Sequence, residues 1–503
     1  GRSIVPKVNI ILGPPGTGKT HNLLNLVEKE LSNGTPPDRI AFVSFTTKAT
    51  NEARERAKIK FNLTDKDLPY FCTLHAFGKR QSGFTKAEIM GPEDYKELAV
   101  NYGVKLKQIV RDWDGNGIIQ TDNKFIRDIN KARMQRVELN EFYNKNNLDY
   151  SWYELLHTYK SLEDYKQGKH KYDFTDMLSH YLAFGEVPPL DVVIVDEAQD
   201  LSQLQWKVCE KIWKNAKRVF ISGDDDQAIF RWAGADVEYL INMDAEISVL
   251  DQSYRCPVEV HKIAYEISSR IRQRREKIWK PREEEGVVRF HAHPTNVNFR
   301  EGNWLVMATC GYMLKEIEED LRQQGLPYII KGKHPVNPTL IRAVNSWNKI
   351  HEMKNIFSKD VISMYSYLTS GGGVKKGFKS GKTIEEDKPY DLTELVLNHG
   401  LNVSNVPWDV AFEKISAEDR YYIMSLEKHG GLVKDPKINL NTVHISKGGE
   451  CDNVMLLTDL SRSNQQEMEK NSDDTNRVFY VGATRAKQSL HIINPQRGRG
   501  FII

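Results

Sequence analysis

A glycine-rich segment near the start of the chain carries the clearest chemical pattern. Residues 13–20 read Gly-Pro-Pro-Gly-Thr-Gly-Lys-Thr and fit G-x-x-x-x-G-K-[ST], whose backbone N–H groups surround nucleotide phosphates. Lys19 would bring a positive charge to the β- and γ-phosphates, and the Thr20 hydroxyl would bind Mg²⁺. The segment therefore predicts a site for a nucleoside triphosphate with Mg²⁺. The residues expected to contact the nucleotide here are Gly13, Pro14, Gly16, Thr17, Gly18, Lys19, Thr20 and His21.

Acidic and amide side chains follow two apolar segments further along the chain. Asp196 and Glu197 come directly after the apolar run 190–195, where the carboxyl end of a parallel strand would place them beside the phosphate loop. Asp196 is the expected Mg²⁺ ligand, and Glu197 would orient or deprotonate the attacking water. Gln227 follows the run 219–222 and could reach the γ-phosphate or that water. The alternative for the acidic pair is an ordinary exit from a strand, which the phosphate loop disfavours.

Three arginines and two aromatic residues complete the set of candidates. Arg255, Arg477 and Arg485 follow predicted strands, and an arginine that faces a γ-phosphate stabilises transition-state charge. Taken alone, each is better explained as a surface or ion-paired arginine. Phe230 and Trp232 stand on a predicted loop, where exposed rings would stack on nucleic-acid bases. Burial of both rings in the core is an equally good explanation.

Short apolar runs that alternate with helical patterns must position these residues. Such alternation is typical of a parallel α/β core. Thr46 and Thr47 are expected to cap a helix that runs through Ala57. The pattern breaks twice, and in the second break the basic residues 375–382 predict a mobile loop. The apolar runs occupy residues 8–12, 40–45, 71–77, 190–195, 218–222, 247–250, 304–308, 438–443, 454–457 and 490–493.

The predicted organisation has two cores, each interrupted by an insertion. The first core comprises residues 1–84 and 186–283, with a helical insertion at 85–185. The second core comprises residues 284–330 and 438–503, with a reduced insertion at 331–437.

Length and composition fit an intracellular globular protein. The chain has 503 residues, of which 40% are apolar and 28% charged. Its net charge of +3 means that any surface for nucleic acid must be local. Five scattered cysteines without a C-x-x-C pair predict neither a zinc site nor a disulfide framework. No signal peptide and no apolar run long enough for a membrane span are visible.

In order and spacing, the motifs resemble those of the UvrD/Rep/PcrA-type superfamily 1 DNA helicases. The resemblance covers both predicted cores nearly end to end. Residues 13–20 match motif I, 42–53 motif Ia, 73–77 motif Ib, 173–178 the D-F-x-D-L/M-L pattern, 196–200 motif II, 223–235 motif III, 250–255 motif IV, 442–450 motif V and 478–486 motif VI.

The resemblance implies two RecA-like P-loop cores with mainly helical insertions, and an ATP-dependent helicase and translocase that moves 3′ to 5′. It implies ATP and Mg²⁺ as cofactors, bound where the first core supplies Lys19 and the second supplies Arg485. Tyr254 would stack on adenine and Glu450 would hold the ribose. The implied catalytic residues are Lys19, Glu197, Gln227, Arg255 and Arg485. The implied strand contacts are Phe45, Thr46, Thr73, His75, Phe230, Trp232 and His444.

The same resemblance implies partners and a location. Single-stranded DNA and tailed duplex DNA would be the substrates of a monomer, with single-strand-binding, replication or repair proteins as partners and no membrane. The expected location is the cytoplasm, in a prokaryotic or phage-encoded protein of the nucleoid. The chain departs from the family pattern in having no glutamine motif before residue 13, Ala233 after the motif III tryptophan, and Gly449 in motif V.

Several other functions stay open. The chain could be a translocase that strips proteins from DNA and unwinds poorly, which the small second insertion favours. It could also be a non-enzymatic binding module gated by a nucleotide, although Lys19, Asp196, Glu197 and Arg485 argue against this. Residues 486–503, which follow Arg485, are too few for a nuclease domain. RNA in place of DNA is a further alternative.

Overall fold

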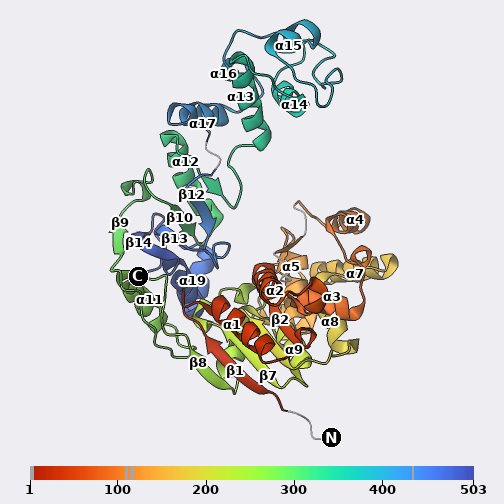
Figure 1. Cartoon of the computed structure of the whole chain (residues 1–503), viewed down its shortest axis with the longest axis vertical. Coiled ribbons are helices and arrows are strands. Elements are labelled where there is room, and N and C mark those ends of the chain that lie inside the picture. Colours follow the sequence, from red (N-terminus) through yellow and green to blue (C-terminus); the bar gives the residue numbers. More distant parts are fainter. Residues whose placement is uncertain (1–4, 108–110, 114–117, 433–434) are drawn as a thin grey trace. The chain divides into compact units, whose positions relative to one another are not determined.

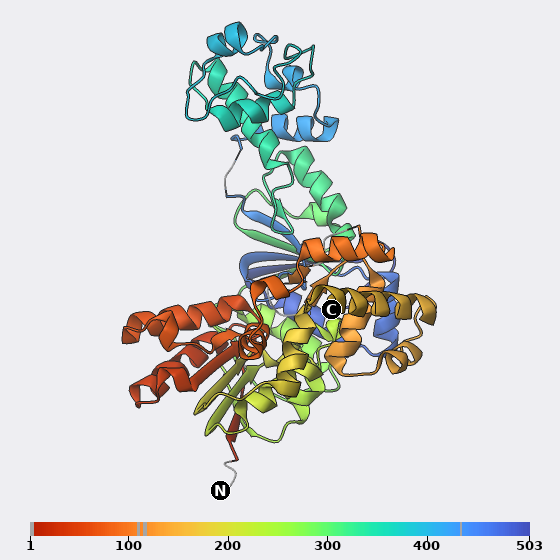
Figure 2. The ribbon, with the colours of Figure 1, turned by 90° about the vertical axis from the view of Figure 1, so that its right-hand side faces the viewer.

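The computed structural model describes residues 5–107, 111–113, 118–432 and 435–503. Contacts divide the chain into two units, and each contains one six-stranded sheet. The first unit comprises Gly1–Gly286, Gln466–Lys487 and Ile503, and the second comprises Val287–Gln465 and Gln488–Ile502. The colours of Figures 1 and 2 follow the chain through both units.

The sheet of the first unit has the strand order β3-β2-β6-β7-β1-β8, and its neighbouring strands are parallel. Strands β2 and β6 are buried along their whole length, as expected for a parallel sheet covered on both faces. Leu12 pairs with Gly223 and Ser44 pairs with Asp196, so the carboxyl ends of these strands meet at one edge. The strands are β1 (Lys7–Leu12), β2 (Ile40–Ser44), β3 (Phe71–Thr73), β6 (Val192–Asp196), β7 (Arg218–Gly223) and β8 (Glu246–Val249).

Helices α1 (Lys19–Ser32) and α2 (Thr47–Phe61) cover one face of this sheet (Figure 2). Leu23 of α1 and Ala53 of α2 share a buried cluster with Ile194, whose strand neighbours point to the other face. Helix α2 continues beyond the expected end at Ala57. Thr46 stands at its N-cap position without a capping hydrogen bond from its side chain, which differs from the expectation.

A group of helices follows β3 and returns the chain to β6. Between its helices runs an antiparallel pair, β4 (Arg111–Trp113) with β5 (Ile118–Gln120). The helices are α3 (Leu74–Ser82), α4 (Pro92–Tyr102), α5 (Lys124–Gln135), α6 (Leu139–Lys145), α7 (Trp152–Lys169) and α8 (Phe174–Phe184).

A buried charge cluster holds α5, α7 and α8 together. Arg133 of α5 donates to Asp173 and to Asp176 over 2.6 Å each. Lys166 of α7 lies 3.2 Å from Asp173 and 2.9 Å from Asp176. Asp173 also caps α8 by accepting from the backbone N–H of Asp176. The two aspartates of the D-F-x-D pattern therefore have structural roles: Asp173 caps α8, and both form ion pairs that join α8 to α5 and α7.

Further helices of the first unit follow β6 in the sequence. They are α9 (Gln203–Trp213), α10 (Val237–Asn242), α11 (Val258–Ser269) and α19 (Asp473–Ala483). Helix α19 comes late in the sequence, but it packs on α11 and on the turn Asp225–Gln227. These contacts are why Gln466–Lys487 groups with the first unit.

The second unit has the strand order β11-β12-β10-β13-β14-β9. Parallel registers join β11 to β12, β10 to both β12 and β13, and β9 to β14. The strands are β9 (Val287–His291), β10 (Trp304–Ala308), β11 (Ile329–Ile330), β12 (Ile438–Thr442), β13 (Cys451–Leu457) and β14 (Ala486–Ile493). The helices are α12 (Lys315–Gln324), α13 (Pro338–His351), α14 (Ser358–Ser366), α15 (Leu392–Asn398), α16 (Trp408–Ala411), α17 (Ala417–Lys428) and α18 (Arg462–Lys470), the last of which crosses the division between the units.

The second insertion shares a buried apolar cluster with the sheet of its own unit. Trp347 and Tyr422 share one continuous buried cluster with Val306 of β10. The stretch predicted to be a mobile loop is instead a series of hydrogen-bonded turns. Val374 is fully buried, and the backbone N–H of Lys375 donates to the Gly400 carbonyl over 2.8 Å.

These observations confirm the predicted fold class, an α/β protein with two parallel-sheet cores of the RecA-like kind. Among the described residues, no helix combines the length and apolar character that crossing a membrane would require.

Candidate functional site

The glycine-rich loop has the backbone that phosphate binding requires. Gly16 and Gly18 have φ angles of 70° and 80°, the left-handed region that favours glycine. Helix α1 begins at Lys19, so the loop ends at a helix N-terminus with unsatisfied N–H groups. A Cβ at Gly13 would lie 1.8 Å from Cγ of Lys19, because the lysine side chain passes directly over that glycine.

A second segment is docked on this loop. The backbone N–H of Tyr254 donates to the Gly16 carbonyl over 2.7 Å, and Ser253 Oγ donates to the Pro15 carbonyl over 2.8 Å. A Cβ at Gly16 would lie 2.4 Å from Cβ of Arg255. The predicted nucleotide residue Arg255 is thus held beside the phosphate loop. Sequence reasoning missed Ser253, whose hydroxyl makes this contact.

Asp196 is buried at the end of β6, with one oxygen unused. Its Oδ1 accepts from the backbone N–H of Glu197 over 2.8 Å, while Oδ2 has no hydrogen-bond partner in the described part of the chain. Burial raises the pKa of Asp196 to about 7; the charge of Glu197 adds to this and that of Lys19 opposes it. An orphaned carboxylate oxygen at the edge of the sheet that carries the phosphate loop fits Mg²⁺, which prefers oxygen ligands.

No cluster of three or more histidine, cysteine or carboxylate side chains that could hold a metal occurs among the described residues. A cation at Asp196 would therefore need other oxygen ligands, such as the Thr20 hydroxyl, water and phosphate.

Glu197 is held from two sides. Its Oε1 lies 3.8 Å from Nζ of Lys19, and its Oε2 accepts from Nε2 of Gln199 over 2.6 Å. The backbone of Glu197 has a φ of 51°, a strained conformation for a residue with a side chain. Gln199 is fully buried and also accepts from the backbone N–H of Asp224 over 3.1 Å. Sequence reasoning missed Gln199, although a polar amide inside a buried turn is a signal.

Gln227 connects the turn after β7 to Arg485. Its Nε2 donates to Oδ2 of Asp224 over 2.8 Å, and its Oε1 accepts from Nη2 of Arg485 over 3.1 Å. Arg255 donates to the Thr484 carbonyl over 3.3 Å, which brings both predicted arginines to the same stretch. The sequence assigns Arg485 to the second core, whereas its contacts group it with the first unit. Hence the first unit holds all five predicted catalytic residues.

A buried ion cluster supports this turn. Nζ of Lys277 lies 3.5, 2.8 and 3.0 Å from carboxylate oxygens of Asp224, Asp225 and Asp226. Burial lowers the pKa of Lys277, but the three carboxylates outweigh that effect and hold it above its usual range. Arg274 donates to both oxygens of Asp226 over 2.8 and 2.6 Å. Lys277 and Arg274 lie outside the sequence motifs, so the sequence does not predict their role in this cluster.

The predicted strand residues divide by burial. Phe45 and Phe230 are buried, with ring centroids 5.6 Å apart. Trp232 is 43% exposed, and its ring centroid lies 6.2 Å from that of Phe230. The two explanations left open by the sequence therefore separate: Phe230 is a core residue and Trp232 presents its ring to solvent.

Thr73 and His75 are both buried, and Thr46 is partly buried. The Thr73 hydroxyl caps α3 by accepting from the backbone N–H of Ala76 over 3.2 Å. Neither ring nitrogen of His75 has a hydrogen-bond partner among the described residues, and burial lowers its pKa to about 4. Because Thr73 and His75 are buried, they would affect a bound DNA strand only by positioning neighbouring residues.

The other predicted residues are exposed or belong to the second unit. Tyr254 is 73% exposed, as a ring that stacks on a base would be. His21 is exposed on α1. In the second unit, His444 is partly buried and Glu450 is exposed, both after β12.

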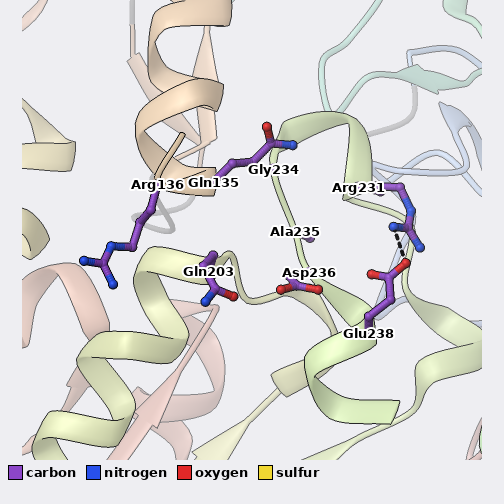
Figure 3. A pocket seen from close by; sticks show the side chains of 8 residues that line it. All are labelled: Gln135, Arg136, Gln203, Arg231, Gly234, Ala235, Asp236 and Glu238. Carbon is purple, nitrogen blue, oxygen red and sulfur yellow. Dashed lines mark hydrogen bonds and ion pairs between the residues drawn. The ribbon is translucent and has the colours of Figure 1, made fainter. Parts of the chain in front are cut away.

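A polar groove of about 620 Å³ lies beside the motif III loop (Figure 3). Arg231 and Glu238 face each other across one side of it and form an ion pair of 2.6 Å. Gln135 extends toward Gly234, whereas the Arg136 side chain points away. The groove is lined by Gln135, Arg136, Gln203, Arg231, Gly234, Ala235, Asp236 and Glu238.

Comparison with known proteins adds a family match. Residues 3–248 match the family described as "UvrD/REP helicase N-terminal domain". The "Probable DNA helicase II homolog" of Rickettsia felis is 23% identical over 621 positions, covering 98% of this chain and 91% of that protein. "DNA helicase II" of Rickettsia typhi is 22% identical, covering 98% and 90%. "DNA helicase II" of Haemophilus influenzae is 25% identical, covering 52% and 38%.

Proposed function

We propose, from the match of residues 3–248 to the UvrD/REP helicase family, that the chain is an ATP-dependent DNA helicase that moves 3′ to 5′ along single-stranded DNA. The observation that carries the proposal is the arrangement at the sheet edge of the first unit. There, the phosphate loop, the Asp196–Glu197 pair and the Gln227–Arg485 contact lie within one connected network. Such a network would bind a triphosphate and respond to its hydrolysis.

The residues of this network would divide the work of ATP hydrolysis. Lys19 would hold the β- and γ-phosphates, while the Thr20 hydroxyl and Asp196 Oδ2 would hold Mg²⁺, which neutralises phosphate charge when bound. The Glu197 carboxylate, oriented by the hydrogen bond from Gln199 to its Oε2, would accept the proton of the attacking water. Arg485 and Arg255 would stabilise negative charge on the γ-phosphate as it leaves.

Trp232 would stack on a base of the bound strand. Its exposed ring borders the buried Phe230, which itself packs on Phe45. A rigid aromatic layer behind an exposed ring favours stacking, which contributes about 1–3 kcal/mol per base and depends little on sequence. We therefore propose single-stranded and tailed duplex DNA as the substrates of a monomer in the cytoplasm.

Unwinding of tailed duplexes tests the proposal directly. A duplex with a 3′ single-stranded tail should be separated in the presence of ATP and Mg²⁺, and one with a 5′ tail should not. The Lys19→Ala variant, which loses its contact with the phosphates, should bind the tail and leave the duplex intact. Separation of the 5′-tailed duplex alone would refute the polarity. Absence of DNA-stimulated ATP hydrolysis would refute the function.

A second candidate is a translocase that displaces proteins from DNA and unwinds poorly. The alignment with the Rickettsia felis protein spans 621 positions against the 503 residues of this chain, so that relative has segments without counterparts here. Removal of streptavidin from biotinylated single strands, without separation of tailed duplexes, would favour this candidate. Equal stimulation of ATP hydrolysis by single-stranded RNA would instead widen the substrate class.

A further inference from the structure

Arg231 precedes Trp232 in the sequence, and its guanidinium forms ion pairs with two carboxylates. Its Nη1 donates to Glu238 Oε1 over 2.6 Å, within the groove of Figure 3. Its Nε lies 3.1 Å from Oδ1 and 2.9 Å from Oδ2 of Asp474. Asp474 is in the first turn of α19, 243 positions further along the chain. The motif III loop is therefore tied to a helix from a distant part of the sequence.

Asp474 also has a second partner on its own helix. Arg477 donates from Nη1 to Asp474 Oδ1 over 3.0 Å and from Nη2 to the Gln273 carbonyl over 2.6 Å. Because Arg477 is fully buried, it fixes one carboxylate oxygen of Asp474 in place. The Asp474 carboxylate therefore bridges a rigid helix and the loop that carries Trp232.

Helix α19 extends from this bridge to the nucleotide site. It ends at Ala483, two residues before Arg485, which contacts Gln227. A helix of 11 residues moves as one body, so a displacement of Arg485 would displace Asp474 as well.

The strength of the Arg231–Asp474 pair suits a contact that is made and broken repeatedly. The two side chains are 34% and 40% exposed, and an ion pair so exposed contributes up to about 1 kcal/mol. By contrast, the Arg274–Asp226 pair in the turn Asp225–Gln227 involves a fully buried carboxylate, which resists separation. This turn is therefore held by a buried ion pair, whereas Arg231 of the motif III loop is joined to α19 by a partly exposed one.

We propose that Asp474 is a positioning residue that couples the nucleotide site to the strand-binding loop. Contact of Arg485 with a γ-phosphate shifts α19, and Asp474 transmits this shift through Arg231 to Trp232. The inference rests on the proposed function. Because coupling free energies are reciprocal, bound DNA also changes the affinity for nucleotide by the same factor.

Asp474→Asn tests this link, since it removes the charge and keeps the shape. ATP hydrolysis without DNA should stay within twofold of wild type, while its stimulation by oligo-dT should fall at least fivefold. The ratio of oligo-dT dissociation constants with and without a non-hydrolysable ATP analogue should approach one. Asp474→Glu should restore most of the stimulation, because it restores the carboxylate.

Two further single variants and one double variant distinguish loss of coupling between the two sites from loss of structure. Glu238→Gln removes the other ion pair of Arg231 without touching α19, and it should keep the stimulation. Arg231→Gln should lose it, and the double variant Arg231→Gln/Asp474→Asn should be no worse than either single variant. If Asp474→Asn does not fold, Arg231→Gln and Asp474→Glu carry the same comparison.

The outcomes distinguish the two proposals. Full stimulation in Asp474→Asn, or additive losses in the double variant, would overturn the coupling role. An equal fall of hydrolysis with and without DNA would overturn it as well. A wild-type protein whose ATP hydrolysis does not respond to oligo-dT would refute the proposed function itself.

Discussion

Gln199 donates a 2.6 Å hydrogen bond to Oε2 of Glu197, the carboxylate proposed to receive a proton from water. The oxygen of the same side-chain amide accepts from the backbone N–H of Asp224, just after the neighbouring strand. The strained backbone of Glu197 and the hydrogen bond from Gln199 together fix how its carboxylate is oriented. Orientation of the general base thus depends on a residue outside the expected set of catalytic residues.

The variant Gln199→Ala should impair turnover more than binding. Loss of a hydrogen bond that orients a reactive group typically costs about 10- to 100-fold in activity. We expect kcat for ATP to fall within that range while the dissociation constant of a fluorescent ATP analogue stays unchanged. Gln205→Ala is the matched control, because Gln205 is also a buried glutamine and its side chain caps α9. A similar loss of kcat in the control would show that disturbance of packing is the cause.

Gly16→Ala should abolish nucleotide binding. The new Cβ would lie 2.4 Å from that of Arg255, and the φ of 70° is itself unfavourable for alanine. The loop must then separate from the 253–255 segment. Gly34→Ala provides the control, since Gly34 has a φ of 89° with no atom within 4 Å of the added carbon. This control measures only the cost of placing alanine in the left-handed region, which is about 1–2 kcal/mol. Retained nucleotide binding by Gly16→Ala in a calorimeter would contradict the described docking.

Acid should destabilise the first unit through His75. Burial lowers the pKa of His75 to about 4, below the 6.5 of an exposed histidine. Between these pH values the unfolded chain binds a proton that the folded chain does not, so stability falls as the pH drops from 6.5 to 4. In urea unfolding, His75→Leu should reduce this slope by about 1.4 kcal/mol per pH unit. The exposed position His157, changed to Leu, serves as control. Identical slopes in wild type and His75→Leu would contradict burial of a neutral ring.

Arg133→Met should loosen the helices that precede β6. It leaves Asp173 and Asp176 with Lys166 as their only strong cationic partner in the described cluster. Removing one member of a buried ion pair costs about 3–5 kcal/mol. Hydrogen exchange should therefore accelerate in α5, α7 and α8. Lys96→Ala, which breaks an exposed pair with Glu93, should change exchange little. Unchanged protection in Arg133→Met would show that apolar packing alone holds these helices.

The parts of the site that the sequence predicts are those in which contiguous residues determine the geometry. Residues 13–20 specify their own turn and helix start, because glycine conformations and a lysine that follows them leave few alternatives. Asp196 is predictable because its strand is wholly apolar and ends at the polar edge of a parallel sheet. The two sheets follow from the same apolar runs, and their fold class is confirmed.

The remaining parts depend on contacts between distant segments. Lys277 contributes a buried charge to a turn some 50 positions earlier, and nothing in its neighbourhood marks it as buried. The burial of Phe230 depends on packing against Phe45, which is distant in the sequence. Likewise, assignment of α19 to the first unit requires its packing on α11.

The return of Gln466–Lys487 to the first unit has a consequence for protein synthesis. Ribosomes make the chain from its N-terminus, so the phosphate loop emerges well before Arg485. A nascent chain that ends near Gly286 has the whole first sheet but lacks α19, and its Gln227 has no arginine to accept from. Translation must therefore pass through residues 287–465 of the second unit before Arg485 can join the nucleotide site, and we expect a chain truncated before α19 to hydrolyse no ATP.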